Sequence, residues 1–281
     1  MRALTFDSVF SNNTVFILDG LMSSDLQTAR HLNEELKDLA YETDTPYCSL
    51  IRIGSRSELF LILDQIRSQC DEGIKPIIHI EAHGDENEGI AVGDNQERVS
   101  WGELVAALGK INETTKNNLG VVMAGCFGLY AIRPISITKP SPFYFLIGSD
   151  TKISAGQIDE VMKNFYRELF NSNSLQIAMK QVDEQFKQFH VEKMFCVSFG
   201  RYIKQQCMGQ GRNDRVEKLL SELVAGGMPN NKESLRNSRK TLKRLIKPSK
   251  ATFERFTKVF MHGRYAITYE QLYAFIGNKN I

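Results

Sequence analysis

The stretch "KPIIHIEAHG" (75–84) decides the fold, because a short apolar run ends there on a His-Gly pair before an acidic loop. Apolar runs of this length, bounded by turn residues, are typical of buried strands. His83 then lies at the end of this predicted strand, where its imidazole can reach solvent. A histidine in this position either satisfies local hydrogen bonds or forms one half of a catalytic pair.

Similar apolar runs lie on both sides of this stretch and alternate with helical patterns. The runs predict further strands over residues 13–20, 46–54, 118–128, 141–150 and 192–200. Apolar residues at helical spacing predict intervening helices over 26–39, 59–70, 104–111, 155–170 and 174–189. Alternating strands and helices predict an α/β fold, a mostly parallel six-stranded sheet flanked by helices. In such sheets, sites form at the carboxyl ends of the strands.

Serines mark the expected starts of three of these helices. Ser23 or Ser24 precedes the first, and Ser55 or Ser57 precedes the second. Ser100 is followed three residues later by Glu103, which is the spacing of a capping box. These positions fix where the chain turns from strand to helix.

Composition describes a globular protein, with 42% hydrophobic and 24% charged residues. No apolar run reaches the roughly 20 residues that cross a bilayer, so we expect no membrane association. Residues 1–16 lack an apolar block with a cleavage site, which argues against a secretory signal. The five cysteines form no CxxC or zinc spacing, so we expect no metal, no cofactor and a cytoplasmic location.

Charge is divided unevenly along the chain. Residues 201–281 contain 17 Lys and Arg against six Asp and Glu, a net of +11, whereas residues 1–200 contain 18 against 27, a net of −9. Residues 201–281 also show helical spacing without a strand pattern. We therefore expect an α/β domain over 1–200 and a small, basic α-helical C-terminal extension over 201–281.

The second half of the candidate pair lies in "VVMAGCFG" (121–128), where an apolar strand delivers Cys126 into a glycine-flanked turn. Gly125 and Gly128 allow the backbone to bend sharply and a substrate to approach. Nucleophilic cysteine catalysis requires a thiolate, an imidazole and N–H donors for the oxyanion. Cys126 would attack, His83 would protonate the leaving amine, and the backbone N–H groups of Gly84 and Cys126 would form the oxyanion hole.

The remaining candidates have structural interpretations. His79 is expected to be a buried structural residue, and Glu81, on the same strand face, receives no role. The other four cysteines fall inside predicted strands or helices or in the C-terminal extension and are expected to be non-catalytic: Cys48, Cys70, Cys196 and Cys207.

The order of these blocks resembles the caspase-like cysteine peptidases, most closely the bacterial CHAT type related to caspases and separases. "HIEAHG" (79–84) is similar to the histidine block of that family and "VVMAGCFG" (121–128) to its cysteine block. "LIGSDTKISAGQIDEVMKNFYREL" (146–169) resembles the strand, acidic turn and helix that follow, and "MFCVSFG" (194–200) resembles the closing strand. The resemblance covers residues 13–200.

The resemblance implies a caspase-like cysteine endopeptidase with a Cys126–His83 dyad and no cofactor. It implies a specific protein substrate and an activating protein partner in bacterial antiviral defence or cell death. Asp150 lies where separase-like relatives keep a substrate-binding acidic residue, which would favour Arg or Lys before the cut. The chain departs from the family in reading Ala-Gly-Cys-Phe instead of Ser-Ala-Cys-Glu, and in having no helical repeats before the domain.

Three alternatives stay open at this point. Asp150 or Thr151 would alternatively begin the following helix, and the loop 129–142 is either a passive linker or a segment cleaved after Arg133 or Lys139. The chain as a whole would alternatively be a non-catalytic caspase-like scaffold. Its basic C-terminal segment would then bind a partner protein or nucleic acid, although no nucleic-acid-binding motif accompanies the basic residues.

Overall fold

The computed structural model describes residues 8–43 and 47–277. Residues 1–7, on which the expectation about a secretory signal partly rests, lie outside the described part, as do Pro46 at the start of the predicted second strand and residues 278–281. Within the described ranges, no helix combines the length and the hydropathy needed to cross a bilayer.

A six-stranded sheet forms the centre of the described chain. Its strands, in the spatial order β2-β1-β3-β7-β8-β9, are Tyr47–Arg52, Thr14–Asp19, Pro76–Glu81, Gly120–Ala124, Phe145–Ser149 and Phe186–His190. Every neighbouring pair is parallel except β8 and β9. The predicted α/β class, with a mostly parallel sheet flanked by helices, is therefore confirmed.

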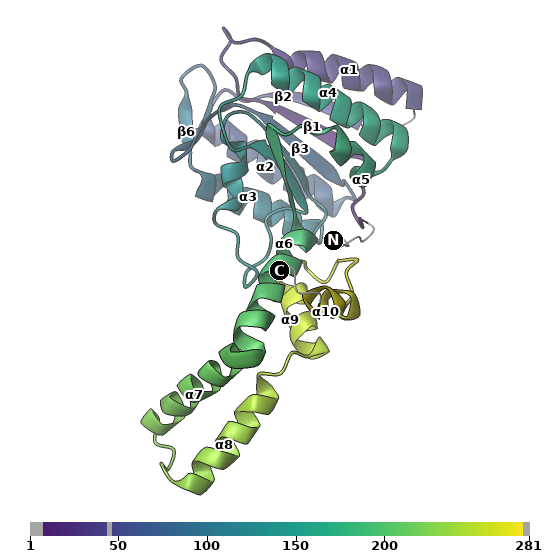
Figure 1. The fold of residues 1–281 in the computed structure, drawn as a ribbon. Coiled ribbons are helices and arrows are strands. Elements are labelled where there is room, and N and C mark those ends of the chain that lie inside the picture. Colours follow the sequence, from purple (N-terminus) through teal and green to yellow (C-terminus); the bar gives the residue numbers. More distant parts are fainter. Residues whose placement is uncertain (1–7, 44–46, 278–281) are drawn as a thin grey trace.

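Helices cover both faces of this sheet (Figure 1). α1 (Thr28–Thr43) and α4 (Ala155–Ser172) lie on one face, and α2 (Arg56–Asp71) and α3 (Trp101–Thr114) lie on the other. Because both faces are covered, β1, β3, β7 and β8 are buried along their whole length. Their side chains are accordingly mostly apolar, without the alternation of a half-buried strand, and this pattern made them recognisable.

Helix caps were predicted with mixed success. Ser55 caps α2, and Ser100 forms the predicted capping box with Glu103 at the start of α3. The expectation that Ser23 or Ser24 starts the first helix is wrong, because α1 begins at Thr28. Ser23 instead donates two hydrogen bonds from the loop after β1, its N–H and Oγ lying 2.5 and 2.8 Å from the carboxylate of Asp94.

The predicted strand over 192–200 and helix over 174–189 are corrected by the structure. The helical pattern gives only α5 (Leu175–Ala178) and a 3-10 turn (Met179–Gln181), after which the chain forms the edge strand β9. Residues Val191–Tyr202 form α6, whose N-terminus is capped by His190. A continuous apolar run of this length fits a buried helix as well as a buried strand, and packing against the C-terminal helices selects the helix.

A small second sheet, which was expected only as an acidic loop, follows β3. It contains β4 (His83–Asp85), β5 (Gly89–Val92) and β6 (Glu97–Val99) in antiparallel order. The predicted strand 75–84 thus ends at Glu81, and His83 belongs to the next sheet. Trp101 closes this sheet, since its indole N–H donates to the carbonyl of Asp85 at 3.0 Å. The ring of Trp101 is buried, so its role is packing.

The C-terminal residues are helical throughout the described part. A π turn (Ile203–Cys207) continues α6 past residue 200 into α7 (Gly209–Ala225), followed by α8 (Lys232–Leu245), α9 (Lys250–Phe260) and α10 (Tyr269–Gly277). α7 and α8 form a hairpin that projects away from the sheet, whereas α9 and α10 return to α6 (Figure 1). The hairpin therefore has most of its surface in solvent.

A buried carboxylate anchors the returning segment to the α/β body. Glu192 accepts hydrogen bonds from the N–H groups of Ala266 and Ile267 at 2.9 and 2.8 Å and from the hydroxyl of Tyr144 at 3.1 Å. Desolvation raises the pKa of this carboxyl, and the three donors partly oppose the rise. A polar group buried without partners costs several kcal/mol, so these donors fix where the extension docks.

Candidate active site

The register of β3 and β7 brings the segments that carry the two candidate catalytic residues to the same end of the sheet. Glu81 pairs with Ala124 at the carboxyl ends of these parallel strands. His83 and Cys126 each follow two residues later, beyond the ends of these strands, and His83 itself pairs with Ala91 in the second sheet.

Two glycines allow the loops beyond these strands to touch. A Cβ atom on Gly125 would lie 2.2 Å from the carbonyl oxygen of Ala82, and one on Gly84 would lie 1.8 Å from the carbonyl oxygen of Cys126. Neither distance is attainable for a side chain, so glycine is required at both positions. The backbone at Gly84 and the backbone at Cys126, the two predicted oxyanion donors, are thereby in direct contact.

His83 and Cys126 line one cavity of about 140 Å³ at the carboxyl edge of the sheet. The imidazole is 46% exposed and the cysteine is half-buried, so both can meet a bound molecule. The other lining residues come from the loop after β1 and from the segment around the start of α4, among them Leu21, Asp25, Ile153, Ala155 and Ile158.

The thiol of Cys126 faces the backbone of Ile153. The Ile153 N–H lies 3.5 Å from Sγ and is placed to donate to it, and the Ile153 carbonyl lies 3.8 Å from the same sulfur. The Cys126 sulfur therefore contacts the backbone amide and carbonyl of Ile153, in a cavity lined otherwise largely by apolar side chains.

The turn after Cys126 is strained. Phe127 adopts a left-handed conformation with φ of 58°, which is uncommon for a bulky residue. Its N–H donates to the carbonyl of Thr151 at 3.1 Å, and its ring packs edge-on against Tyr130 at the start of the loop that follows. Strain of this kind is held by its surroundings and is concentrated at functional sites.

A carboxylate that was not anticipated contacts the imidazole. Oδ2 of Asp25 lies 2.8 Å from Nε2 of His83. Asp25 belongs to the loop after β1, 58 residues before His83, and no local pattern marks it. The available signal was topological, since a loop leaving β1 passes beside the end of its neighbour β3.

Beneath the cavity, the second histidine has the structural role expected of it. His79 is fully buried, with Nδ1 at 3.2 Å from the hydroxyl of Tyr166 and Nε2 at 3.1 Å from Glu81. Glu81 also accepts a short hydrogen bond from Thr28. This network joins β3 to α1 and α4, and both Glu81 and Thr28 reach the cavity wall.

The other cysteines are buried: Cys48, Cys70, Cys196 and Cys207. Desolvation raises the pKa of Cys48, Cys70 and Cys196 to about 12. Thiols in this condition are protonated at neutral pH and unreactive. Cys126, which is half-buried, is the most accessible of the five cysteines.

Asp150 does not line the cavity. It lies near Tyr130, whose phenol has a pKa raised first by desolvation, then by a hydrogen bond with Glu86 and by the Glu86 and Asp150 carboxylates. The alternative role as a helix start is wrong for both Asp150 and Thr151, because Ser154 caps α4. Arg133 covers this acidic surface, with its guanidinium 3.6 Å above the Tyr130 ring and 3.1 Å from Glu86.

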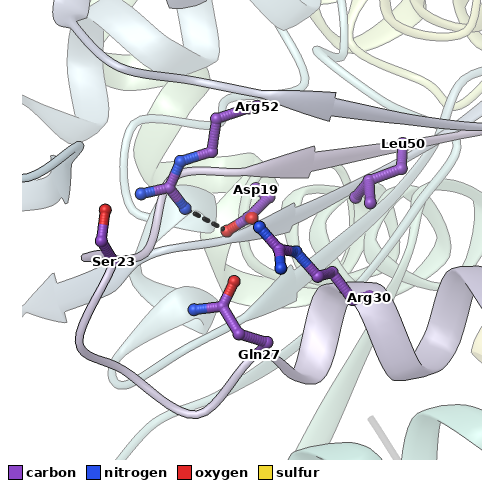
Figure 2. A pocket seen from close by; sticks show the side chains of 6 residues that line it. All are labelled: Asp19, Ser23, Gln27, Arg30, Leu50 and Arg52. Carbon is purple, nitrogen blue, oxygen red and sulfur yellow. Dashed lines mark ion pairs between the residues drawn. The ribbon is translucent and has the colours of Figure 1, made fainter.

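A larger cavity, of about 330 Å³, lies beside the ends of β1 and β2 (Figure 2). The buried carboxylate of Asp19 pairs with Arg52 at 3.0 Å, and the side chain of Arg30 also lines the cavity. Its lining contains no thiol and no imidazole, so size alone does not identify the reactive site. It is lined by Asp19, Ser23, Gln27, Arg30, Leu50 and Arg52.

Among the residues that the structure describes, no three His, Cys, Asp or Glu side chains are grouped closely enough to hold a metal ion. No family model matches the chain, and no curated protein matches it significantly in a sequence search. The fold and the site thus define an α/β protein with a thiol and an imidazole in one cavity, and the function has to be argued from that geometry.

Proposed function

We propose that the chain is a cysteine endopeptidase of the caspase-like, CHAT-type group, with a dyad of Cys126 and His83. The observation that carries the proposal is that these two side chains, 43 positions apart in the sequence, line one cavity at the carboxyl edge of adjacent parallel strands. The sequence resemblance to that group points to the same two residues.

The chemistry follows from the positions of the groups. The Cys126 thiol passes its proton to His83, and the sulfur attacks the carbonyl carbon of a peptide bond. Backbone N–H groups of Gly84 and Cys126 stabilise the oxyanion. His83 then protonates the leaving amine as the C–N bond breaks, which leaves a thioester on Cys126. Water, deprotonated by His83, hydrolyses the thioester and restores the thiol.

We also propose that the enzyme prefers substrates with a basic residue before the cut, and this preference is supported by the negative charge of one surface. Asp150 and Glu86 carry negative charge beside Tyr130, and the chain's own Arg133 already occupies that surface. A guanidinium is thus accepted there, which suits a substrate Arg or Lys. Access for a substrate side chain requires Arg133 to move aside.

The resemblance extends the proposal to biology: a cytoplasmic enzyme, activated by a protein partner, that cuts one dedicated protein in defence or cell death. The test is co-expression of candidate substrates with the wild type and with Cys126→Ala. Cleavage by the wild type alone, abolished by His83→Ala, supports a peptidase. Irreversible labelling of Cys126 by a peptide electrophile such as an arginyl chloromethyl ketone would support it without a known substrate.

A non-catalytic scaffold is the second candidate, and the exposure of α8 favours it. Within the described chain no residue of α8 is fully buried, although the helix carries Arg236, Arg239, Lys240, Lys243 and Arg244. Such a surface suits an acidic protein or a nucleic acid. If the electrophile labels Cys126 no faster than the buried thiols, and His83→Ala changes nothing, the scaffold replaces the peptidase.

A further inference from the structure

Asp25 and His83 form the most specific polar contact in the cavity. The 2.8 Å hydrogen bond joins a carboxylate that is 21% exposed to an imidazole that is 46% exposed. An ionised carboxylate only accepts hydrogen bonds, so the imidazole donates through Nε2. In the neutral ring this leaves Nδ1 as the nitrogen able to receive a proton.

The loop holds the carboxylate in a fixed position. The same oxygen, Oδ2, accepts the N–H of Met22 at 2.8 Å, and the Asp25 N–H donates to the Met22 carbonyl at 3.1 Å. The side-chain amide of Gln27 donates to the Asp25 carbonyl at 2.9 Å. A loop constrained in this way presents its carboxylate to His83 without further ordering, which is how a supporting residue preorganises a reactive one.

Sheet order explains why a carboxylate, an imidazole and a thiol meet. β3 lies between β1 and β7, so the loop after β1 borders the end of β3 on one side and the Cys126 turn borders it on the other. His83 therefore lines the same cavity as Asp25 and Cys126, with Asp25 as its hydrogen-bonded partner. The arrangement has the carboxylate–imidazole–nucleophile order of a catalytic triad.

We infer that Asp25 is a positioning residue for His83, which rests on the proposed peptidase function and extends its dyad. The carboxylate selects the tautomer with Nδ1 unprotonated and stabilises the imidazolium that forms when Cys126 loses its proton. Asp25 touches neither the nucleophile nor the substrate; it acts through the imidazole.

The alkylation rate of Cys126 by iodoacetamide at pH 7, followed by peptide mass spectrometry on the full chain, tests this without a known substrate. Asp25→Asn keeps an oxygen for the Met22 N–H but removes the charge, and we expect the rate to fall about tenfold. The matched control is Asp94→Asn. It alters a carboxylate that accepts hydrogen bonds from Ser23, which lies in the same loop as Asp25, and Asp94 itself lies away from His83. Its rate should equal that of the wild type.

A double-mutant cycle with His83→Ala separates positioning from a general effect on the loop. Asp25→Asn should have no further effect once the imidazole is gone. If Asp25→Asn reacts like the wild type, or slows alkylation equally in the His83→Ala background, the inference is overturned. If His83→Ala itself leaves the rate unchanged, the proposed peptidase function fails instead, so the two failures are distinguishable.

Discussion

Replacing Gly84 by alanine tests the contact on which the site geometry depends. The new Cβ would lie 1.8 Å from the carbonyl oxygen of Cys126 and 2.9 Å from its carbonyl carbon. Both neighbours are backbone atoms at the end of a buried strand, so they cannot rotate away as a flexible side chain would. The two loops would have to separate by more than about 1 Å before the contact became tolerable.

This separation predicts two measurable effects. Forced overpacking of a closely packed site costs about 1–3 kcal/mol, so the free energy of unfolding in urea should fall by that amount. A shift of about 1 Å between reacting groups can cost about 100-fold in rate, so alkylation of Cys126 should slow more than stability alone would suggest.

Gly102→Ala is the matched control, because a Cβ at this position in α3 meets nothing within 4 Å. Alanine is the better helix former, so this variant should keep the alkylation rate and gain up to about 1 kcal/mol. Wild-type stability together with a wild-type Cys126 rate in Gly84→Ala would refute the reasoning. The His83 and Cys126 loops would then not be pressed together as described.

Two further predictions concern the anchoring of the C-terminal extension. Burial lowers the pKa of His190 from 6.5 to about 4, so the free energy of unfolding should fall by about 2 kcal/mol as the pH falls through this window. His190→Asn preserves the cap of α6, and in this variant the urea midpoints measured at pH 6.5, 5.5 and 4.5 should depend less on pH. An unchanged dependence of the midpoint on pH would contradict this prediction. Glu192→Ala should leave two backbone amides unpaired, lower the free energy of unfolding by about 2–4 kcal/mol and speed hydrogen exchange at Ala266 and Ile267. Glu192→Gln keeps an acceptor oxygen and should retain slow exchange at these two amides. Equal exchange rates in both variants would show that the carboxylate does not anchor this segment.

The central strands could be read from the sequence because their burial is local in origin. Residues 76–81 and 120–124 are almost continuously apolar, since helices cover both faces of the strands they form. Parallel pairing then brings the carboxyl ends to one edge, which is why His83 and Cys126 were expected together. The placement of these two residues at one end of the sheet depends only on which segments form strands and on the direction in which those strands run.

The end of the α/β body could not be read in this way. β9 is an edge strand with the sequence Phe-Lys-Gln-Phe-His, and its consecutive residues Lys187 and Gln188 are polar and exposed. α6 is apolar because Phe195 and Phe199 pack against Phe253 of α9, a contact between segments more than 50 residues apart. The sequence shows that this segment is apolar, but it does not show that Phe253 packs against it. This packing is what selects a helix over a strand.

Asp25 illustrates a different limit. Acidic residues in loops are common, and the sequence between Gly20 and Thr28 offers no reason to prefer this one. Its significance arises from β1 and β3 being neighbours, with Gly20 N–H donating to the Glu81 carbonyl at 2.8 Å and so tying the start of the loop to the end of β3. A pairwise contact of this kind is visible only after the strand order is known.

Strand direction also determines what the basic hairpin is able to do. Because β9 is antiparallel, its last residue, His190, pairs with Phe145 at the start of β8, at the edge of the sheet opposite the cavity. α6 leaves from that edge, and the returning segment contacts it too, with Ser141 N–H donating to the Phe260 carbonyl and the Asn117 amide donating to the Arg264 carbonyl. A partner bound to α8 is therefore remote from Cys126. It would act on the cavity by recruiting substrate or by shifting the packing of the sheet, and not by covering the thiol directly.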